Sequence, residues 1–143
     1  TLTVPEDFQR TIGLNDYATI QFKSKLPKPN SYGFVIFEHK DELKLADSNL
    51  DMIDYTLNSI EPYTEQKGFR YIKQPYITYE QGFNYAYAEF ETNDPDMERI
   101  YFLQTIIETK GFIYQILQYC SYTDREIMKS DFVKIVNSFK VEH

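Results

Sequence analysis

The clearest pattern in the chain lies in its last third, where two apolar runs rich in β-branched and aromatic residues flank a short polar turn. The runs cover residues 99–108 and 112–122, and residues 109–111 join them. Apolar runs of this length on either side of a glycine-containing turn predict a β-hairpin. Because both faces of each run are apolar, we expect these strands near the centre of a sheet that is covered on both sides.

An amphipathic segment follows this hairpin directly. Its apolar residues Met128, Phe132, Ile135 and Phe139 stand at i, i+4, i+7 and i+11, which is the stripe of a helix that packs on a core. Thr123 and Glu126 have the spacing of a capping box, in which each side chain satisfies a free N–H of the first helical turn. The pattern predicts a C-terminal helix that begins beside these two residues.

A second helical pattern covers residues 47–61, in which Ile53, Leu57 and Ile60 stand at i, i+4 and i+7. This single stripe predicts a surface helix. Ser48 or Asn49 is the expected N-cap, Asp51 favours the first turn through the helix dipole, and Pro62 is expected to end the helix.

The remaining segments show the alternation typical of strands. Residues 17–25 alternate, residues 33–38 are continuously apolar, and the proline-containing break between them predicts an antiparallel hairpin. Alternation returns over residues 69–79 with an interruption at Pro75, and after a Gln81-Gly82 turn it is strongest over residues 83–91. In that last strand Phe83, Tyr85 and Tyr87 share one face, and the other face carries two alanines that would let a helix pack closely.

The predicted order is β-β-α-β-β-β-β-α, with a further short strand near the N-terminus. Antiparallel strands with two helices define the α+β class, here a sheet flanked by helices in an α/β/α sandwich. The chain has 143 residues, without a repeat or a Gly/Ser linker, so residues 1–143 are expected to form a single domain.

This arrangement resembles the Mog1/PsbP-like superfamily, which includes DcrB-like bacterial lipoproteins and chaperones of type VI secretion effectors. The resemblance implies the same sandwich fold and a binding, assembly or chaperone role without catalytic residues. The sequence departs from the family in having no tryptophan and an unusually large number of tyrosines. The features that carry the resemblance are the entry at residues 4–8, the Gly33-Phe34 strand start, the helix around residues 53–60, the Gln81-Gly82 turn before residues 83–90, and the closing Ser138-Phe139.

The charge and composition exclude some kinds of partner. The formal net charge is −7 and there is no basic run, so binding to nucleic acid or to an anionic membrane surface is not expected. No stretch approaches the roughly 18 apolar residues of a transmembrane helix. The chain begins at Thr1 rather than at a methionine, and we expect that a leader segment has been removed from it.

No group of residues has the pattern of a catalytic or metal site. The carboxylates that we considered for acid/base work, or for a calcium loop in the case of the last three, are expected to be solvated: Asp47, Asp51, Asp54, Glu89, Glu91, Asp94, Asp96 and Glu98. His39 and His143 with one distant cysteine do not make a zinc site. We expect His39 to be exposed and Cys120, inside a strand, to be a small core residue, and we predict no cofactor, no metal and no enzymatic activity.

The aromatic residues are the remaining candidates, because the chain has 13 tyrosines and 11 phenylalanines. Rings on neighbouring strands can form a platform for a partner, and the alternative is that helices and loops cover them. An open platform requires that both helices pack on the alanine-bearing face. The residues predicted to bind a ligand or partner are Tyr79, Phe83, Tyr85, Tyr87 and Tyr114, to which Tyr122 on an adjacent strand can be added.

These observations predict a non-enzymatic binding or assembly module that recognises a protein partner through a tyrosine-rich sheet face. The expected setting is an exported, periplasmic or lipid-anchored protein. One alternative is a cytoplasmic chaperone-like adaptor that shields an apolar helix of a secreted effector, a role usually filled by dimers. A second alternative is a small enzyme of a cystatin-like or NTF2-like fold with a tyrosine-lined cavity.

Overall fold

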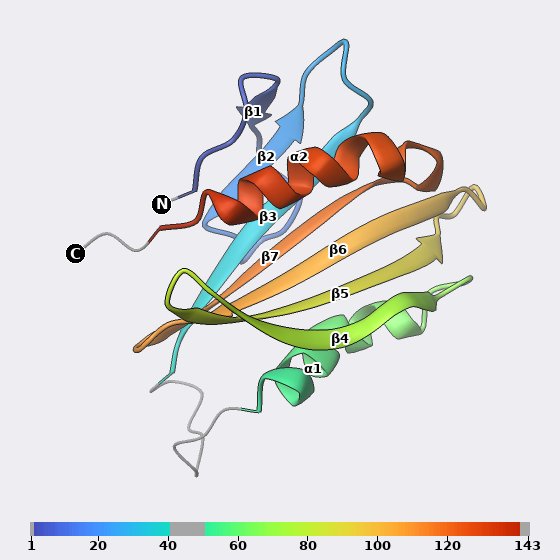
Figure 1. Cartoon of the computed structure of the whole chain (residues 1–143). Helices are drawn as coiled ribbons and strands as arrows, with labels where there is room; N and C mark the ends of the chain where they lie inside the picture. The colour runs from blue at the N-terminus through green and yellow to red at the C-terminus, as the bar shows by residue number, and fades with distance from the viewer. Residues whose placement is uncertain (1, 41–50, 141–143) are drawn as a thin grey trace.

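The structure, a computed structural model, describes residues 2–40 and 51–140, which form a seven-stranded antiparallel sheet and two α-helices (Figure 1). The strands lie in the order β1-β2-β3-β7-β6-β5-β4. In chain order the elements are β1 (Phe8–Arg10), β2 (Ile20–Ser24), β3 (Ser31–His39), α1 (Met52–Thr64), β4 (Arg70–Glu80), β5 (Phe83–Asn93), β6 (Arg99–Glu108), β7 (Phe112–Ser121), the 3₁₀ turn η1 (Tyr122–Asp124) and α2 (Arg125–Asn137). The predicted order and the additional N-terminal strand are confirmed.

The helices cover opposite faces of the sheet, as Figure 1 shows. Helix α1 packs on the face that carries Ala86 and Ala88, where Ile60 and Met52 join the core. Helix α2 packs on the other face, where Val136 contacts the cluster that contains Tyr85. The α+β class and the α/β/α sandwich are therefore confirmed, and the aromatic face of β5 is the one that α2 covers.

The hairpin formed by β6 and β7 lies at the centre of the sheet, as its apolar faces predicted. Every residue of β6 from Tyr101 to Ile107 is buried. Strand β7 also pairs with β3, and strand β6 also pairs with β5, so neither edge of the hairpin is open. Burial of both faces explains why these strands read as continuous apolar runs.

Helix α1 differs from the prediction in its start, its end and its buried face. Its N-cap is Asp51, whose Oδ1 accepts hydrogen bonds from the N–H groups of Ile53 and Asp54 at 3.0 and 3.1 Å. The predicted caps Ser48 and Asn49 lie outside the described residues. Pro62 does not end the helix, because the next residue, Tyr63, places its ring 5.4 Å from that of Phe90 and holds the last turn on the sheet.

The buried stripe of α1 is Met52, Thr56 and Ile60, so it is rotated from the predicted one. Leu57 is exposed, and only Ile60 of the predicted residues is fully buried. Thr56 can be buried because its hydroxyl donates to the carbonyl of Met52 at 2.7 Å. A pattern that counts only apolar side chains does not detect this satisfied polar residue.

Helix α2 begins without the predicted capping box. Residues 122–124 form the turn η1, and no side chain caps the helix at Asp124. The Thr123 hydroxyl instead lies 3.1 Å from that of Ser121. The predicted core stripe is confirmed, since the residues that compose it are all buried: Met128, Phe132, Ile135 and Phe139.

Strands β4 and β5 form the hairpin at the edge of the sheet. Gln81 and Gly82 both have positive φ, 51° and 84°, which is the type I′ geometry of a two-residue turn. The predicted turn is confirmed, and Glu80 pairs directly with Phe83 across it. Pro75 does not split β4 but lies where the pairing shifts register between Lys73 and Tyr76.

Candidate functional site

The structure does not assemble the predicted aromatic residues into an open platform. Tyr85 is fully buried under α2, with 0% exposure, and this removes it as a partner-binding residue. The physical reason is that the C-terminal helix packs on the ring-bearing face, and its apolar stripe needs those rings as a floor. Tyr85 is therefore a core residue.

The other predicted rings divide between three places. Phe83 and Tyr114 contact the ring of Phe139, with centroids 6.4 and 4.8 Å away, and form part of the packing at the end of α2. Tyr79 is 73% exposed and projects from β4 on the opposite face of the sheet. Tyr87 is half-buried and lines a cleft between α2 and the β4–β5 hairpin. Tyr122 lies in η1 rather than on a strand, and it does not line this cleft.

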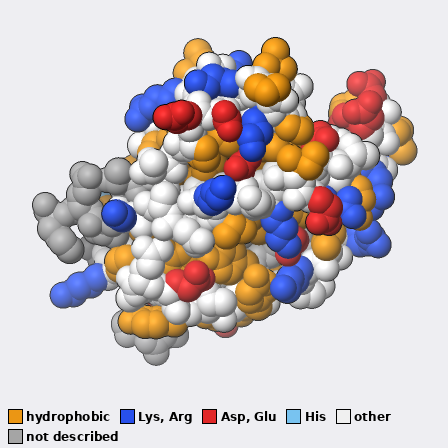
Figure 2. Space-filling model, turned by 45° about the horizontal axis from the view of Figure 1, so that its top comes forward, with side chains coloured by type: hydrophobic (Ala, Val, Ile, Leu, Met, Phe, Trp, Pro, Cys, Tyr) orange, Lys and Arg blue, Asp and Glu red, His pale blue; other side chains and the backbone are white. Residues whose placement is uncertain are grey.

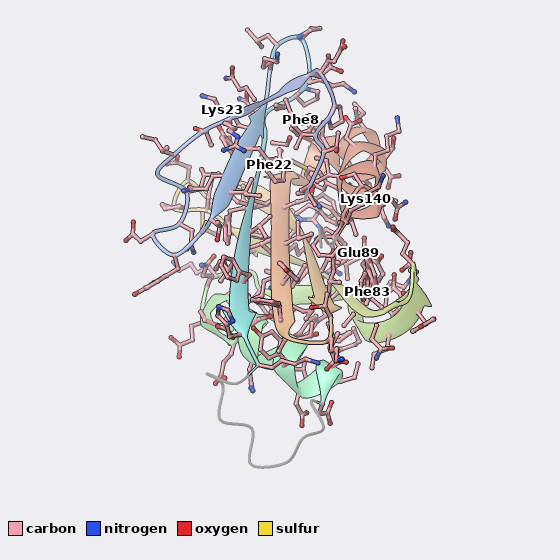
Figure 3. All side chains as sticks on the ribbon, turned by 90° about the vertical axis from the view of Figure 1, so that its left-hand side faces the viewer. Phe8, Phe22, Lys23, Phe83, Glu89 and Lys140 are labelled. Atoms are coloured by element: carbon pink, nitrogen blue, oxygen red, sulfur yellow. The ribbon has the colours of Figure 1, made fainter. Side chains whose placement is uncertain are left out.

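The cleft beside Tyr87 has a volume of about 420 Å³, and we take it as the candidate site. Its size is within the range of pockets that bind small molecules or single side chains. Phe83, the first residue of β5, and Glu89, near the middle of the same strand, both face the α2 side of the sheet (Figure 3). The residues that line the cleft are Lys73, Tyr76, Thr78, Glu80, Tyr87, Glu89, Leu103, Lys129, Val133, Val136 and Asn137.

Glu80 is the polar centre of the outer part of this cleft. Its Oε2 accepts hydrogen bonds from the hydroxyl of Tyr87, at 2.8 Å, and from that of Thr78. Burial and the nearby carboxylate raise the pKa of the Tyr87 phenol, so it remains a protonated donor. Within the described residues, no Lys or Arg forms an ion pair with Glu80.

Two tyrosine rings line the same part of the cleft as this carboxylate. The rings of Tyr76 and Tyr87 have centroids 5.6 Å apart and planes inclined by 30°. The ammonium group of Lys73 lies 4.7 Å from the centroid of Tyr76, which is a cation–π contact. The outer part of the cleft therefore combines one carboxylate with aromatic faces, and one of those faces already holds a cation.

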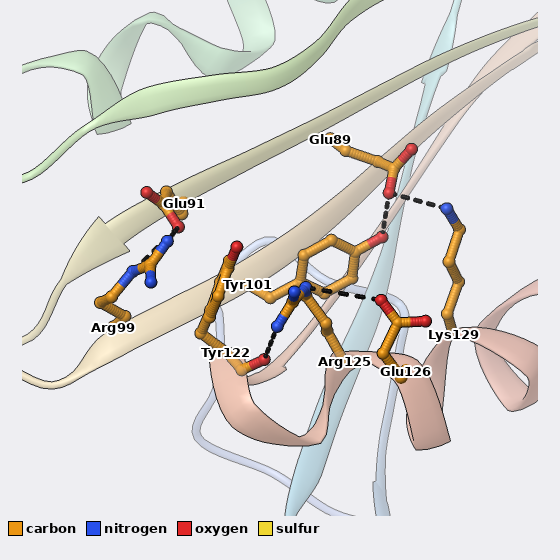
Figure 4. Close-up of polar contacts among 8 residues, drawn as sticks. All are labelled: Glu89, Glu91, Arg99, Tyr101, Tyr122, Arg125, Glu126 and Lys129. Carbon is orange, nitrogen blue, oxygen red and sulfur yellow. Dashed lines mark hydrogen bonds and ion pairs between the residues drawn. The ribbon is translucent and has the colours of Figure 1, made fainter.

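The inner part of the cleft contains an ion pair whose carboxylate is buried. Glu89, predicted to be solvated, is only 7% exposed. It accepts hydrogen bonds from the Tyr101 hydroxyl at 2.6 Å and from Lys129 Nζ at 3.0 Å, as Figure 4 shows. Strand alternation placed Glu89 on the same face as Tyr87, but the sequence did not show that Tyr101 and Lys129 would meet it there.

Glu91 is likewise buried rather than solvated, at 6% exposure. Arg70 donates to one of its carboxylate oxygens and Arg99 to the other. The guanidinium of Arg99 also stacks on the ring of Tyr122, 3.4 Å from its centroid, while Arg125 lies 3.8 Å from the same ring (Figure 4). One arginine is thus held by a carboxylate and by a tyrosine face together.

The other described carboxylates and the cysteine carry no site, and the candidates Asp47 and His143 lie outside the described residues. Among residues 2–40 and 51–140, no group of His, Cys, Asp and Glu could hold a metal ion. His39 is exposed, as predicted, and Asp94 closes a turn by accepting the N–H groups of Asp96 and Glu98, both at 2.9 Å. Cys120 is buried, as predicted, and burial raises the pKa of its thiol to about 12.

The surface agrees with the absence of a basic run in the sequence. On the face seen in Figure 2, Lys and Arg side chains are interspersed with Asp, Glu and apolar side chains and do not gather in one patch. None of the helices in the described ranges is long and apolar enough to cross a membrane.

Sequence reasoning missed Tyr76 and Glu80, although a signal for both was present. A two-residue turn at Gln81-Gly82 fixes the register, so that Glu80 faces Phe83 and Tyr76 faces Tyr87. Residues directly opposite each other project from the same face of a sheet. Counting back across the turn places both side chains on the α2 face.

No family model matches the sequence, and no similar sequence was found among curated proteins. Solved structures do match. LpqN of Mycobacterium tuberculosis, described as involved in cell envelope biogenesis, has a TM-score of 0.68 at 11% identity, over 94% of this chain and 78% of that chain. PA94 of Pseudomonas aeruginosa, a protein of unknown function and putative regulator, has a TM-score of 0.68 at 10% identity, over 95% of this chain and 98% of that chain.

Cyanobacterial PsbP of Synechocystis is also similar, with a TM-score of 0.65 at 16% identity, over 96% of this chain and 84% of that chain. These matches establish that the chain has the Mog1/PsbP-like fold, as its sequence features implied. At this level of identity they define the fold alone. The function must be argued from the site.

Proposed function

We propose that this protein is a non-enzymatic binding module that takes up an extended segment of a protein partner along strand β4. The observation that carries the proposal is the outer edge of β4, an eleven-residue strand that ends the sheet. No described residue pairs with that edge. The strand also exposes large apolar side chains on both of its faces: Ile72, Tyr76, Ile77 and Tyr79.

The hairpin register shows which backbone groups of β4 are free. Glu80 and Phe83 flank a two-residue turn and therefore form a hydrogen-bonded pair. Thr78 and Tyr76 then also point their N–H and C=O groups inward, toward β5. The corresponding groups of Ile77 and Tyr79 point outward, where an added strand can bind them.

The segment over residues 76–80 lacks most features that normally protect an edge strand. Pro75 and the shifted pairing protect only the first half of β4. Beyond them, Ile77 is 48% exposed and Tyr79 73% exposed, so apolar side chains lie beside the free backbone groups. A bound segment would cover this apolar surface and satisfy the free edge.

The cleft gives such a complex its specificity. In an added strand, residues opposite Ile77 and Tyr79 lie on the α1 face, and the residue between them lies on the α2 face. That residue is opposite Thr78, beside the opening of the cleft. We place this activity at the cell envelope, in an exported or lipid-anchored protein, and the envelope role given for LpqN supports that setting.

The proposal is tested by selecting short random peptides on the wild-type protein and measuring backbone amide exchange in the complexes. We expect the amides of Ile77 and Tyr79 to exchange rapidly in the free protein and to be protected when a peptide is bound. Those of Thr78 and Glu80 should be protected in both states, because β5 already accepts them.

Two variants of one residue separate backbone pairing from side-chain contact. Tyr79→Pro removes an outward N–H at an edge position that tolerates proline, and should weaken selected peptides by about tenfold or more. Tyr79→Leu keeps the N–H and should retain most of the affinity. Peptides that bind Tyr79→Pro as well as wild type, or that protect no amide of β4, would show the proposal to be wrong.

A further inference from the structure

We infer that the outer part of the cleft is a binding site for a guanidinium group, and that the partner segment inserts an arginine side chain there. This inference rests on the proposed function, because the added strand delivers the side chain. It is carried by three observations: a carboxylate at Glu80 that forms no ion pair with any described residue, two tyrosine rings that line the same part of the cleft, and the same recognition already made elsewhere in this chain.

Glu80 differs from the other carboxylates on the α2 face. Glu89 is neutralised by Lys129 at 3.0 Å, Glu91 by two arginines, and Asp131 by Lys28 at 2.9 Å. Glu80 is half-buried but has only hydroxyl donors among the described residues, and both of them bind its Oε2. No hydrogen bond from a described residue reaches its Oε1, so this oxygen can accept from a charged donor. The site therefore has a carboxylate that is not matched by a cation.

The tyrosine rings that line the outer part of the cleft provide a surface on which a planar cation can stack. Tyr76 and Tyr87 lie 5.6 Å apart between their centroids, and Tyr87 is held in position by its hydrogen bond to Glu80. Tyr76 already has the ammonium of Lys73 over its face. Lys73 is exposed and is not paired with Glu80, so its flexible side chain can move aside for a better-placed cation.

Elsewhere in this chain, a carboxylate and a tyrosine ring already bind an arginine side chain together. Arg99 donates to Glu91 and stacks on Tyr122 at 3.4 Å, so a carboxylate and a tyrosine ring hold one guanidinium. The cleft at the edge of the sheet likewise contains a carboxylate, that of Glu80, and an exposed tyrosine ring, that of Tyr76. A guanidinium suits both contacts better than an ammonium, because it is planar and donates two hydrogen bonds in parallel.

The other charges in the cleft do not favour an anion. Lys129 is committed to Glu89, which also accepts the Tyr101 hydroxyl. Lys73 is then the remaining cation among the residues that line the cleft, and its ammonium group lies over the ring of Tyr76. The unmatched charge is that of Glu80, which makes the site complementary to a positive side chain.

The test is an NMR titration with N-acetyl-arginine N-methylamide, compared with the neutral citrulline analogue of the same shape. We expect saturable shifts at Tyr76, Glu80 and Tyr87 with a Kd on the order of 1 mM, and no saturation with citrulline. Glu80→Gln should weaken binding by about tenfold. The matched control is Glu61→Gln, which removes an exposed carboxylate from α1 and should leave binding unchanged.

The variant Lys73→Gln tests whether the site prefers a positively charged ligand. It should strengthen binding of the arginine probe by a few fold, because it removes the competing ammonium from Tyr76. Weaker binding in Lys73→Gln, equal binding of citrulline, or equal losses in Glu80→Gln and Glu61→Gln would each overturn the inference.

The inference and the proposed function fail in different ways. If selected peptides protect the edge amides of β4 but the arginine probe does not bind, then the edge pairing holds and the arginine site is wrong. If the probe binds at Glu80 while no peptide protects Ile77 or Tyr79, then the cation site holds and the edge pairing is wrong.

Discussion

The hydroxyl of Tyr101 lies 2.6 Å from the carboxylate of Glu89, and both side chains are buried on the α2 face of the sheet. Burial and the carboxylate raise the pKa of the phenol, so it remains a donor. Lys129 completes the group from α2 at 3.0 Å. This contact joins strands β5 and β6 to the helix that covers them, at the inner end of the cleft.

Tyr101→Phe should lower the free energy of unfolding by about 1–3 kcal/mol, because it removes a buried hydrogen bond to a charged acceptor and little volume. Urea unfolding followed by circular dichroism measures the change. Tyr17→Phe is the control, since Tyr17 is 83% exposed and its loss of a hydroxyl should have no effect. Equal stability of Tyr101→Phe and wild type would mean that the contact contributes nothing.

Tyr85→Phe and Tyr85→Ala should have very different effects. The Tyr85 hydroxyl is buried and has no hydrogen-bond partner in the described part of the chain, so its removal should be neutral or should stabilise the protein. Tyr85→Ala should cost about 3–5 kcal/mol, because it leaves a cavity under α2. Thermal unfolding of both variants checks this. A Tyr85→Ala variant as stable as wild type would contradict the assignment of Tyr85 to the core.

Gly33→Ala should destabilise the protein, because a Cβ at this position would lie 2.4 Å from the ring of Phe22. Phe22 is 1% exposed and cannot move without disturbing the core around it. We expect a loss of about 1–3 kcal/mol in chemical denaturation. In the background Phe22→Leu the same change should cost less, and additive losses in this double-mutant cycle would argue against the steric explanation.

The Cys120 thiol should resist alkylation by iodoacetamide in the native protein at pH 8 and react readily in denaturant. Its pKa is raised by burial from 9.0 to about 12, so the native thiol is protonated and inaccessible. The unfolded thiol ionises above about pH 9 and the folded one does not. This group therefore lowers the free energy of unfolding as the pH rises from about 9 to about 12.

The control for this prediction is Cys120→Ala, measured over the same range of pH. Tyrosines titrate there too, so the quantity to compare is the difference between the two proteins at each pH. That difference should be constant below pH 9 and should shift in favour of the variant above it. A difference that does not vary with pH would show that the thiol does not contribute.

The fold was predictable because its central elements are strongly patterned. The runs that became β6 and β7 are apolar on both faces, and the stripe from Met128 to Phe139 leaves little choice of buried face. Where side chains hydrogen-bond locally, the pattern misled. Thr56 is buried in place of Leu57, and Asp51 caps the helix instead of lying within its first turn.

The candidate site was less predictable, because it depends on which face each helix covers. Period-2 alternation correctly placed Tyr85 and Tyr87 on one side of β5, but it did not show that α2 would bury the first and leave the second at a cleft. The ion pairs could not be predicted from the sequence either. Glu89 meets Lys129 across forty positions of sequence, and no local pattern predicts that pairing.

The two ends of the sheet are unequal, since β1 has three residues and β4 has eleven. Growth of a sheet by strand addition needs a long edge on each side, as in a fibril. Here the edge at β1 is too short to accept a further strand. The described part of the chain can therefore end a β-sheet through β4 but cannot extend it on the other side. A complex made through β4 should therefore have a fixed stoichiometry of one domain per guest strand.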